Sequence, residues 1–566
     1  MNTDTFKTFD NEALFYYEWN FKPNQKTLIL IHRGHEYGER LAEFATHPKF
    51  SSYNIFAFDL RGHGHSKVGV SPVFMDYVRD LDTFSKFLKQ KYKVKENDTF
   101  LVANSIGGVI VSAWVHDFAP EIAGMVLLAP AFEINLIVPL AEQFITLGTK
   151  LNKNFIVKSY VKSTMLTQDV AQQKRYDKDV LITREINGRL LIDLANHGRR
   201  LVADAAAITV PTLILSAEKD KVVINKTQKK FYVALDAELK DFVTLKDFMH
   251  GILFEKERIN VYGIIKDFIA KAFLEDTVPY NLKPDYFTQK EYETMQYGLI
   301  PKTEKANFKF QKWSLGKIGT LSRGMAIGLK YGFDSGISLD YVYKNKPQGK
   351  WGVGKIMDKN YLNAIGWQGI RIRKQHLLKM LESAVETLQE QGQKIKILDI
   401  AGGTGNYLFD IKKKYPEAEI VVNDFVKSNI EEGEKTASKQ GFTNFRFTNL
   451  SCFDSDIYQK LNFEPNITVI SGIFELFGDN QLVNNAIKGV VSISQKGGFV
   501  IYTGQPWHPQ LKMIAFVLKS HQDKDWVMRR RSQRELDKIM KYNHIKKESM
   551  FVDDFGIFTV SKGIIG

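Results

Sequence analysis

Three residues in the first half of the chain have the types and the order that serine-based hydrolysis requires. Ser105 lies in the stretch LVANSIGG, where a short apolar run ends in a turn that contains glycine. Asp220 and His250 each follow a later apolar run. A serine nucleophile needs a base that accepts its proton and an acid that orients the base, and Ser–Asp–His is the chain order of one hydrolase class. We therefore interpret Ser105 as the nucleophile, His250 as the general base and Asp220 as the orienting acid.

The turn around Ser105 departs from the usual G-x-S-x-G pattern at one position. Gly107 and Gly108 are present, but Ala103 stands where the first glycine is expected. The change adds one methyl group at a position that needs a small residue, so it is mild. This turn alone does not decide between a nucleophile and a structural serine, and it is the later acid and histidine that favour the nucleophile.

A second glycine-rich turn, DIAGGTG, runs from Asp399 to Gly405 and suggests a different chemistry. It follows the apolar run KIKILD directly and precedes a helical pattern, which is the context of a nucleotide-type binding turn. Glycines there leave room for a ligand to approach the backbone. The next apolar run ends at Asp424, and a carboxylate at that place can bind both hydroxyls of a ribose. The spacing predicts a cofactor site without choosing the cofactor.

Two series of short, nearly uniform apolar runs must position these residues. The first series lies at 26–32, 53–59, 98–105, 124–130, 211–216 and 241–245. The second series lies at 394–399, 418–424, 445–449, 467–471 and 498–504. Runs of this length are typical of strands that are buried on both faces of a parallel sheet and covered by helices. The predicted fold class is α/β, with one sheet in each half of the chain.

The length of 566 residues is too great for a single hydrophobic core. We predict one domain over 1–277, a linker rich in proline and charge over 278–310, and a second domain over 311–566. Residues 132–208 interrupt the first series with amphipathic helical patterns. We expect them to form a helical cap over the carboxyl ends of the strands, where such sheets bind ligands.

The composition limits the classes of partner. The formal net charge is +14, which attracts nucleic acid, anionic lipid headgroups or phosphorylated substrates. No nucleic-acid-binding module and no metal-ligand spacing is recognisable, so we expect neither nucleic acid nor a metal. The partner that remains compatible with this charge is an anionic membrane surface, contacted peripherally. The alternative is that the excess lysines serve only solubility. The single cysteine, Cys452, excludes an intrachain disulfide.

The N-terminal sequence and the longest apolar stretches allow a prediction of where the protein is located. The N-terminus has no basic start followed by an apolar core, so we predict no signal peptide. The longest apolar stretches are broken by Glu133, Asn135 and Glu142 before they reach the roughly 20 residues that a spanning helix needs. We therefore expect a soluble cytoplasmic protein that can contact the inner face of the membrane peripherally. The oligomeric state is left open.

Two further segments relate the first half to a known family. The stretch DLRGHGHS at 59–66 and the histidine-led loop that begins at His32 resemble α/β-hydrolases of the monoacylglycerol lipase and lysophospholipase type. The resemblance covers 1–275 and implies hydrolysis of an acyl lipid or lysophospholipid ester. It also implies that the backbone N–H groups of Gly34 and Ile106 stabilise the oxyanion, although Arg33 stands where that family usually has glycine.

Residues 394–504 resemble the Rossmann-like class I methyltransferases that use S-adenosyl-L-methionine, and this resemblance names the cofactor. It implies that Asp424 binds the ribose, that the turn at Ser451 and Cys452 contacts the adenine, and that Ser471 lies beside the methyl donor. The full set of implied cofactor-binding residues is Asp399, Ala401, Gly403, Gly405, Asp424, Ser451, Cys452 and Ser471.

Four more segments, at 332–345, 361–374, 503–510 and 526–537, resemble a bacterial family of fused α/β-hydrolase and methyltransferase proteins associated with phospholipid-type metabolism. They supply candidate residues for the methyl acceptor. These are Tyr361, Trp367 and Arg371 as a lid, Gln505, Trp507 and His508 beside the acceptor, and Arg529, Arg530, Arg531 and Arg534 as a phosphate grip. The alternatives are a packed strand end for His508 and a solvated helix face for the arginines.

The residues and resemblances together predict a bifunctional enzyme with an ester hydrolase half and a methyltransferase half. Two alternatives remain. In the first, only the methyltransferase is active and the hydrolase-like domain binds a lipid-like acceptor. In the second, the chain is a basic membrane-surface scaffold with neither activity.

Overall fold

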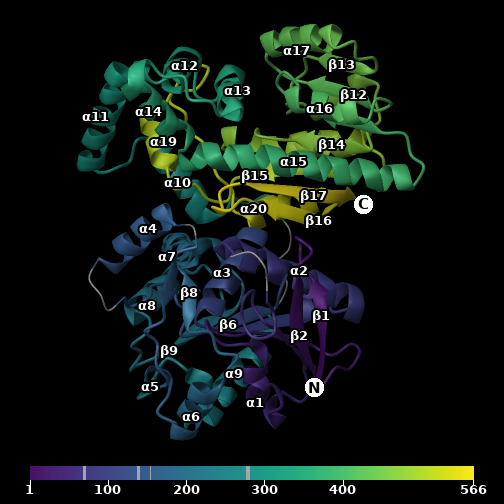
Figure 1. Cartoon of the computed structure of the whole chain (residues 1–566). Helices are drawn as coiled ribbons and strands as arrows, with labels where there is room; N and C mark the ends of the chain where they lie inside the picture. Colours follow the sequence, from purple (N-terminus) through teal and green to yellow (C-terminus); the bar gives the residue numbers. More distant parts are fainter. Residues whose placement is uncertain (68–71, 137–139, 153, 276–280) are drawn as a thin grey trace. The chain divides into compact units, whose positions relative to one another are not determined.

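A computed structural model describes residues 1–67, 72–136, 140–152, 154–275 and 281–566 (Figure 1). The chain divides into two compact units, Met1–Val278 and Pro279–Gly566, each with its own sheet. The predicted boundary at residues 277 and 278 lies outside the described residues. Each unit is described by itself below.

The sheet of the first unit has eight strands in the order β1-β2-β4-β3-β5-β6-β9-β10. The strands from β4 to β10 along this order pair in parallel, and β2 pairs antiparallel with both β1 and β4. Their bounds are β1 Asn2–Lys7, β2 Ala13–Trp19, β3 Thr27–Ile31, β4 Asn54–Phe58, β5 Thr99–Asn104, β6 Gly124–Leu128, β9 Thr212–Ala217 and β10 Lys240–Leu245. All six predicted strands of the first series are present, and β1 and β2 were missed.

The helices of the first unit pack around this sheet and form the cap. Outside the cap they are α1 Ala42–Ala45, α2 Phe74–Tyr92, α3 Ile106–Phe118, α8 Asn225–Ala234 and α9 Arg258–Ala272. Within the predicted cap they are α4 Ala141–Leu151, α5 Ser163–Leu166, α6 Val170–Lys178 and α7 Gly188–Ala203. The cap also holds a short antiparallel pair of strands, β7 Ile156–Lys158 and β8 Glu185–Asn187, which the helical pattern did not indicate. Residues 137–139 and 153 of the predicted cap lie outside the described residues.

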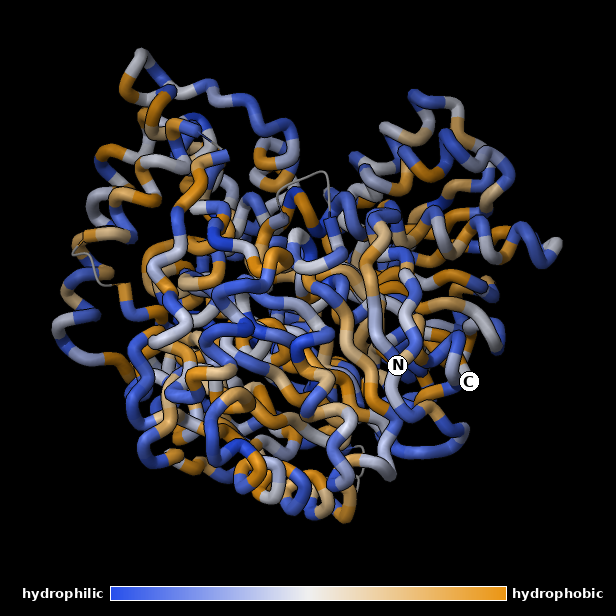
Figure 2. Tube along the Cα trace, turned by 60° about the horizontal axis from the view of Figure 1, so that its bottom comes forward, coloured by the Kyte–Doolittle hydropathy of each residue, from blue (hydrophilic) through white to orange (hydrophobic). Residues whose placement is uncertain are grey.

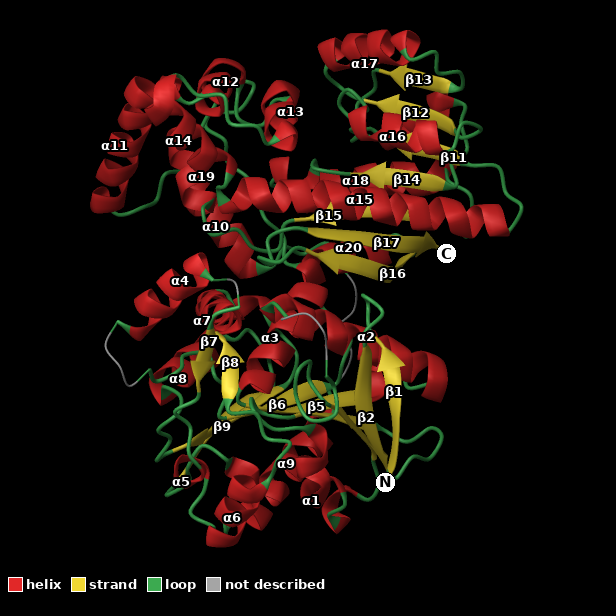
Figure 3. Ribbon diagram, in the orientation of Figure 1, coloured by secondary structure: helices red, strands yellow, loops and turns green. Residues whose placement is uncertain are grey.

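The sheet of the second unit has seven strands in the order β13-β12-β11-β14-β15-β17-β16 (Figure 3). The first five pair in parallel, and β17 pairs antiparallel with β15 and β16. The bounds are β11 Lys396–Asp399, β12 Glu419–Asn423, β13 Phe445–Thr448, β14 Ile467–Ile470, β15 Phe499–Gly504, β16 Ile545–Val552 and β17 Thr559–Ile565. The predicted α/β fold class is confirmed for both units, with β16 and β17 added to the second series.

Helices cover both faces of the second sheet. On one face α15 Ile365–Glu390 and α16 Asn406–Lys414 pack against the strands through Leu381, Leu408 and Ile501. On the other face α18 Asn480–Ile493 and α20 Gln533–Tyr542 pack through Ile487 and Ile539. Helix α17 Lys427–Lys439 contacts the edge strand β13. This three-layer packing explains why the central strands are apolar on both faces.

A lobe of helices lies at one end of this unit and has its own apolar core. It contains α10 Tyr286–Gln296, α11 Lys302–Ile318, α12 Arg323–Tyr331, α13 Gly336–Lys344, α14 Trp351–Leu362 and α19 Leu511–Val517. Much of the segment 278–310, which we expected to be a linker, is therefore helical, and Met295 of α10 is buried in the core of the lobe.

Among the described residues, none of the helices combines the length and the hydrophobicity of a membrane span. Colouring by hydropathy agrees with this, because hydrophobic and hydrophilic residues alternate in short runs along the trace (Figure 2).

Candidate active sites

The backbone at Ser105 forms a sharp turn between β5 and α3. Ser105 has φ 53° and ψ −114°, a left-handed conformation that side chains rarely adopt. The glycines that follow make the turn possible, because a Cβ at Gly107 would lie 2.8 Å from the His32 carbonyl oxygen and one at Gly108 would lie 2.9 Å from the Pro130 side chain. Ala103, by contrast, is an ordinary buried residue of β5, and the strand accommodates its methyl group.

The structure brings Ser105, His250 and Asp220 into one hydrogen-bonded row. The Ser105 hydroxyl lies 2.9 Å from Nε2 of His250, and Nδ1 of His250 lies 2.8 Å from Oδ2 of Asp220. The three residues follow β5, β10 and β9, whose carboxyl ends meet at one edge of the parallel sheet. All three lie at the carboxyl ends of strands in one sheet, which is why residues 145 positions apart along the chain become partners.

The Asp220 carboxylate is held by more than the histidine. Its Oδ1 accepts hydrogen bonds from the backbone N–H groups of Val222 at 2.8 Å and Val223 at 3.0 Å. Burial opposes ionisation of this carboxyl group, but the His250 ring and the two N–H groups outweigh burial and lower the Asp220 pKa. Asp220 is therefore ionised at neutral pH and oriented toward Nδ1.

Gly34 and Ile106 lie next to each other beside the serine. A Cβ at Gly34 would be 3.3 Å from Cδ1 of Ile106. Ile106 is the first residue of α3, and an N–H group at that position has no acceptor within its own helix. Both residues line the same cavity as Ser105 and His250. The arrangement suits a pair of backbone donors for an oxyanion.

Arg33, the residue that departs from the family pattern, is buried in the wall of this cavity. Its Nη2 donates to Glu36 at 2.7 Å, and its guanidinium lies 4.8 Å from the centre of the Phe254 ring. Gly251, which follows the histidine, makes room for it, since a Cβ there would lie 2.4 Å from Nη1 of Arg33. Glu36 also pairs with Arg40, so the arginine braces the loop that carries Gly34.

The cavity of the first unit has a volume of about 400 Å³ and a mostly apolar lining. The cap supplies much of that lining, including Ile145 of α4 and Leu190, Leu191 and Leu194 of α7. A cavity of this size and character fits an acyl chain whose ester reaches Ser105.

The second glycine-rich turn connects β11 to α16 in the second unit. Gly403 and Gly405 have φ angles of 58° and 71°. A Cβ at Gly402 would lie 2.6 Å from Oδ2 of Asp399, so this glycine is required, and the sequence reasoning did not single it out. The Asp399 carboxylate accepts the N–H of Ala401 at 3.2 Å and is buried, which raises its pKa to about 7.

Asp424 lies beside this turn at the end of β12. Its Oδ2 accepts the N–H of Gly403 at 2.9 Å, and its Oδ1 accepts the N–H of Val426 and the amide of Asn429. Two carboxylate oxygens offer about four acceptor sites, so one remains for a ligand hydroxyl. The next residue, Phe425, has a side chain that is 77% exposed. An exposed aromatic ring beside this carboxylate offers a flat apolar surface to a ligand, and the signal in the sequence was its adjacency to Asp424.

The remaining implied cofactor residues lie at the same edge of the sheet. Ser451 and Cys452 follow β13, and Ser471 follows β14. The Cys452 side chain is part of the core, and burial raises the pKa of its thiol to about 12. Ser451 and Ser471 are half-buried. The chemistry of this edge of the sheet fits S-adenosyl-L-methionine. Its donors and acceptors come from the glycine-rich turn, the Asp424 carboxylate and the ends of β13 and β14, and the Phe425 ring lies beside them.

A cavity of about 710 Å³ adjoins this edge and extends into the helical lobe. Gly472, Gln505 and His508 line it from the carboxyl ends of β14 and β15, and Tyr361 and Trp367 line it from the lobe. Two other predicted residues, Arg371 and Trp507, are not among those that line the cavity. The Arg371 guanidinium donates to the Leu362 carbonyl, and Trp507 is half-buried.

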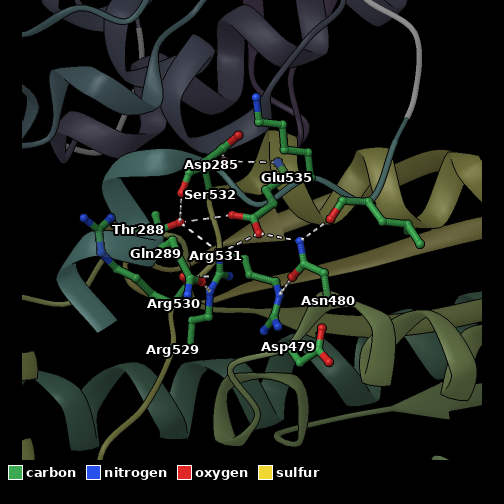
Figure 4. Close-up of polar contacts among 12 residues, drawn as sticks. Asp285, Thr288, Gln289, Asp479, Asn480, Arg529, Arg530, Arg531, Ser532 and Glu535 are labelled. Carbon is green, nitrogen blue, oxygen red and sulfur yellow. Dashed lines mark hydrogen bonds and ion pairs between the residues drawn. The ribbon is translucent and has the colours of Figure 1, made fainter. Parts of the chain in front are cut away.

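The arginines within 529–534 form neither the phosphate-binding site nor the solvated helix face that the sequence suggested (Figure 4). Arg529 is fully buried and donates to Glu535 at 2.8 Å and to Gln289 at 2.9 Å. Arg530 binds Glu291 and the Pro506 carbonyl, and Arg531 binds Asn480 and two carbonyl oxygens. Arg529 and Arg530 thus connect α10 to α20 and to the segment after β15, whereas Arg531 binds the segment after β14 and α18. Arg534 is half-buried.

Among the described residues, no group of three or more histidine, cysteine or acidic side chains is placed to hold a metal ion.

Comparisons with known proteins match both units. A family model described as "Putative methyltransferase" matches residues 265–564, and one described as "Serine aminopeptidase, S33" matches residues 22–257. The uncharacterized protein YnbC of Escherichia coli K12 is 37% identical over 99% of this chain and 97% of its own length.

Two relatives match the first unit alone. A protein of Schizosaccharomyces pombe named "Putative monoglyceride lipase" is 26% identical over 47% of this chain and 71% of its own length. The phospholipase YtpA of Bacillus subtilis is 23% identical over 44% of this chain and 98% of its own length. The chain thus joins a lipase-like hydrolase domain to a domain of the methyltransferase family.

Proposed function

This chain belongs to the family described as "Putative methyltransferase", and we propose that it is a bifunctional enzyme of lipid metabolism. The first unit hydrolyses the ester of an acyl lipid or lysophospholipid, and the second unit transfers a methyl group from S-adenosyl-L-methionine. The observation that carries the proposal is the hydrogen-bonded row from Ser105 through His250 to Asp220. That row favours hydrolysis over a domain that only binds lipid.

In the hydrolase, the Ser105 hydroxyl attacks the ester carbonyl while Nε2 of His250 takes its proton. Asp220 keeps the ring oriented and stabilises the positive charge that the ring acquires. The N–H groups of Gly34 and Ile106 donate to the oxyanion. His250 then returns the proton to the leaving alcohol, and water releases the acyl group by the same steps.

An alkyl fluorophosphonate probe tests this half directly, because it labels only an activated serine. We expect stoichiometric labelling of the wild-type chain and none of Ser105→Ala. Ser159→Ala is the matched control, since Ser159 lines the same cavity and has no histidine partner among the described residues. A folded wild-type chain that resists the probe would refute the hydrolase.

In the methyltransferase, S-adenosyl-L-methionine supplies an electrophilic methyl group on a sulfonium sulfur. Asp424 would accept a ribose hydroxyl at its remaining acceptor site, and the exposed Phe425 ring would offer a surface to the adenine beside the strand ends that carry Ser451 and Ser471. The turn from Asp399 to Gly405 leaves backbone space for the rest of the ligand.

Isothermal titration with S-adenosyl-L-methionine and S-adenosylhomocysteine tests this half. We expect Asp424→Ala to weaken both by about tenfold or more, because hydrogen bonds to a charged group are lost. Asp410→Ala on the exposed face of α16 is the control and should bind normally. A wild-type chain that binds neither compound would remove the methyltransferase from the proposal.

We propose further that the protein is cytoplasmic and contacts the inner face of an anionic membrane. Helix α4 presents Phe144, Leu147 and Leu151 to solvent, and Leu140 precedes it. Exposed apolar residues on a cap helix and a net charge of +14 together suit a lipid surface.

A further inference from the structure

The cavity of the second unit contains buried donors that have no acceptor. Nε2 of Gln505, Nε1 of Trp526 and the Tyr361 hydroxyl find no hydrogen-bond acceptor among the described residues. Their residues are only 4%, 9% and 8% exposed, and all three line the cavity. A buried donor without a partner costs free energy, so three of them around one cavity indicate a ligand rich in acceptor oxygens.

His508 adds a fourth donor to the same cavity. Burial lowers the pKa of His508 to about 4, so the ring is neutral at physiological pH. Its Nδ1 accepts the backbone N–H of Gln510 at 3.1 Å. The proton of the neutral ring must therefore be on Nε2, which lies 2.9 Å from the position of a Cβ at Gly366, another lining residue. His508 thus offers an N–H group and not the base that the sequence suggested.

The two carboxylates that line the cavity are both engaged. Glu475 pairs with Arg373 at 3.3 Å, and Asp334 accepts the backbone N–H and the ring Nδ1 of His521. His521 also lines the cavity, is exposed, and is held by Asp334 through its Nδ1. The unpaired donors described above favour a headgroup that accepts hydrogen bonds over a protonated amine.

From these contacts we infer that the cavity binds the carboxylate of a long-chain acid as the methyl acceptor, an inference that rests on the proposed methyltransferase function. A carboxylic acid is ionised at neutral pH and needs no base. Its oxygen forms the new bond to the methyl carbon as the sulfur–carbon bond breaks, giving a neutral ester and a neutral thioether with no proton transferred. Arg373 lies beside Gly472 at the end of β14, and its guanidinium has N–H groups beyond the one that faces Glu475 to donate to the carboxylate.

The shape and surroundings of the cavity suit an aliphatic chain. About 710 Å³ with a mainly apolar lining lies within the range of small-molecule sites. Helix α11 forms one wall, and its Phe310 and Ile318 line the cavity while remaining partly exposed. Trp313 on the same helix is also exposed, and so are Lys309 and Lys317. Apolar and basic residues there attract an anionic amphiphile, and ester hydrolysis in the first unit releases a carboxylate of this class.

Isothermal titration of the full chain with a set of C12 compounds tests the headgroup. We expect dodecanoate to bind and dodecanol and methyl dodecanoate to bind about tenfold or more weakly, since they lack the charge. Dodecylamine should not bind. Equal affinity for the acid and the alcohol, or a preference for the amine, would overturn the inference.

A matched pair of cavity-filling variants identifies the site, because the first unit also has an apolar cavity. Ala364→Trp fills the cavity of the second unit, and Ala141→Trp fills that of the first. We expect only Ala364→Trp to abolish the titration with dodecanoate. Loss in Ala141→Trp alone would place the acid in the hydrolase cavity and refute the inference.

Two further variants remove single donors and keep the side-chain bulk. Gln505→Leu and Tyr361→Phe should each weaken dodecanoate binding by about tenfold. Neither should lower the melting temperature of the free chain, because each donor is unpaired there. Lower melting temperatures with unchanged binding would show that the donors have only a structural role.

The outcomes separate this inference from the proposed function. A chain that binds S-adenosyl-L-methionine but not dodecanoate overturns the inference alone. A chain that binds dodecanoate but not S-adenosyl-L-methionine overturns the methyltransferase and with it the role of the acid as acceptor. When both bind, methyl-labelled cofactor should transfer its label to methyl dodecanoate.

Discussion

Replacing Asp220 with asparagine should switch off the hydrolase by changing which nitrogen of His250 carries the proton. Oδ1 of Asp220 accepts two backbone N–H groups, at 2.8 and 3.0 Å. In Asp220→Asn the amide oxygen must take that position, because an NH2 group there would face two donors. The NH2 group then replaces Oδ2, 2.8 Å from Nδ1 of His250, and donates to it. Nε2 becomes protonated and can no longer accept the Ser105 proton.

The expected loss in kcat/KM is about 10³- to 10⁴-fold, or about 4–5.5 kcal/mol of transition-state stabilisation. The assay is hydrolysis of 4-nitrophenyl octanoate by the wild-type and variant chains. The melting temperature should remain within about 2–4 °C of the wild type, since the backbone contacts persist. Asp247→Asn is the control, because Asp247 is exposed in the same loop region and its carboxylate pairs with Lys219 on the surface. An Asp220→Asn variant that keeps more than about a tenth of the activity would refute the tautomer argument.

Three other predictions concern stability and the membrane. Arg529→Met should lower the free energy of unfolding in urea by about 3–5 kcal/mol, because Glu535 keeps a buried charge without its cation, whereas Lys427→Met on the surface should change it by less than about 0.5 kcal/mol. Equal effects would contradict the structural role of the arginine. Asp399 has a pKa raised by burial from 3.8 to about 7, so its contribution to stability is present at low pH and is lost as pH rises from about 4 to about 7. The melting temperature of Asp399→Asn should therefore fall less between pH 5 and 8 than that of the wild type, and parallel curves would argue against it. Phe144→Ser with Leu147→Ser on α4 should reduce sedimentation with anionic vesicles several-fold, and unchanged sedimentation would exclude α4 as the contact.

The strands that carry the sites could be predicted from local sequence. Most of them lie in the interior of a parallel sheet and are buried on both faces, so their runs are uniformly apolar. The strands β10 and β13 lie at sheet edges and are only partly buried. The strands that were missed lie at or near the edges. The residues of β16, for example, are a mixture of buried, half-buried and exposed positions, and β1 is exposed at all but one position. Their pairing depends on neighbours far along the chain.

The arginine run illustrates a limit of local reasoning. Four arginines within six residues are typical of a solvated or anion-binding surface. In the structure three of them are buried because acceptors from α10, from the turn after β14 and from α18 surround them. No spacing within 526–537 indicates those partners.

By itself, the sequence determined the candidate residues and their order: Ser105, Asp220 and His250 in the first unit, and the turn from Asp399 to Gly405 with Asp424 in the second. These follow from local rules, since a strand end, a glycine turn and a short polar loop are each specified by a few neighbouring residues. Only the tertiary structure decided that His508 is a donor, that the arginines are structural and that unpaired donors surround an apolar cavity. Those properties depend on burial and on hydrogen-bond partners that are distant in sequence, and both exist only once the chain has folded.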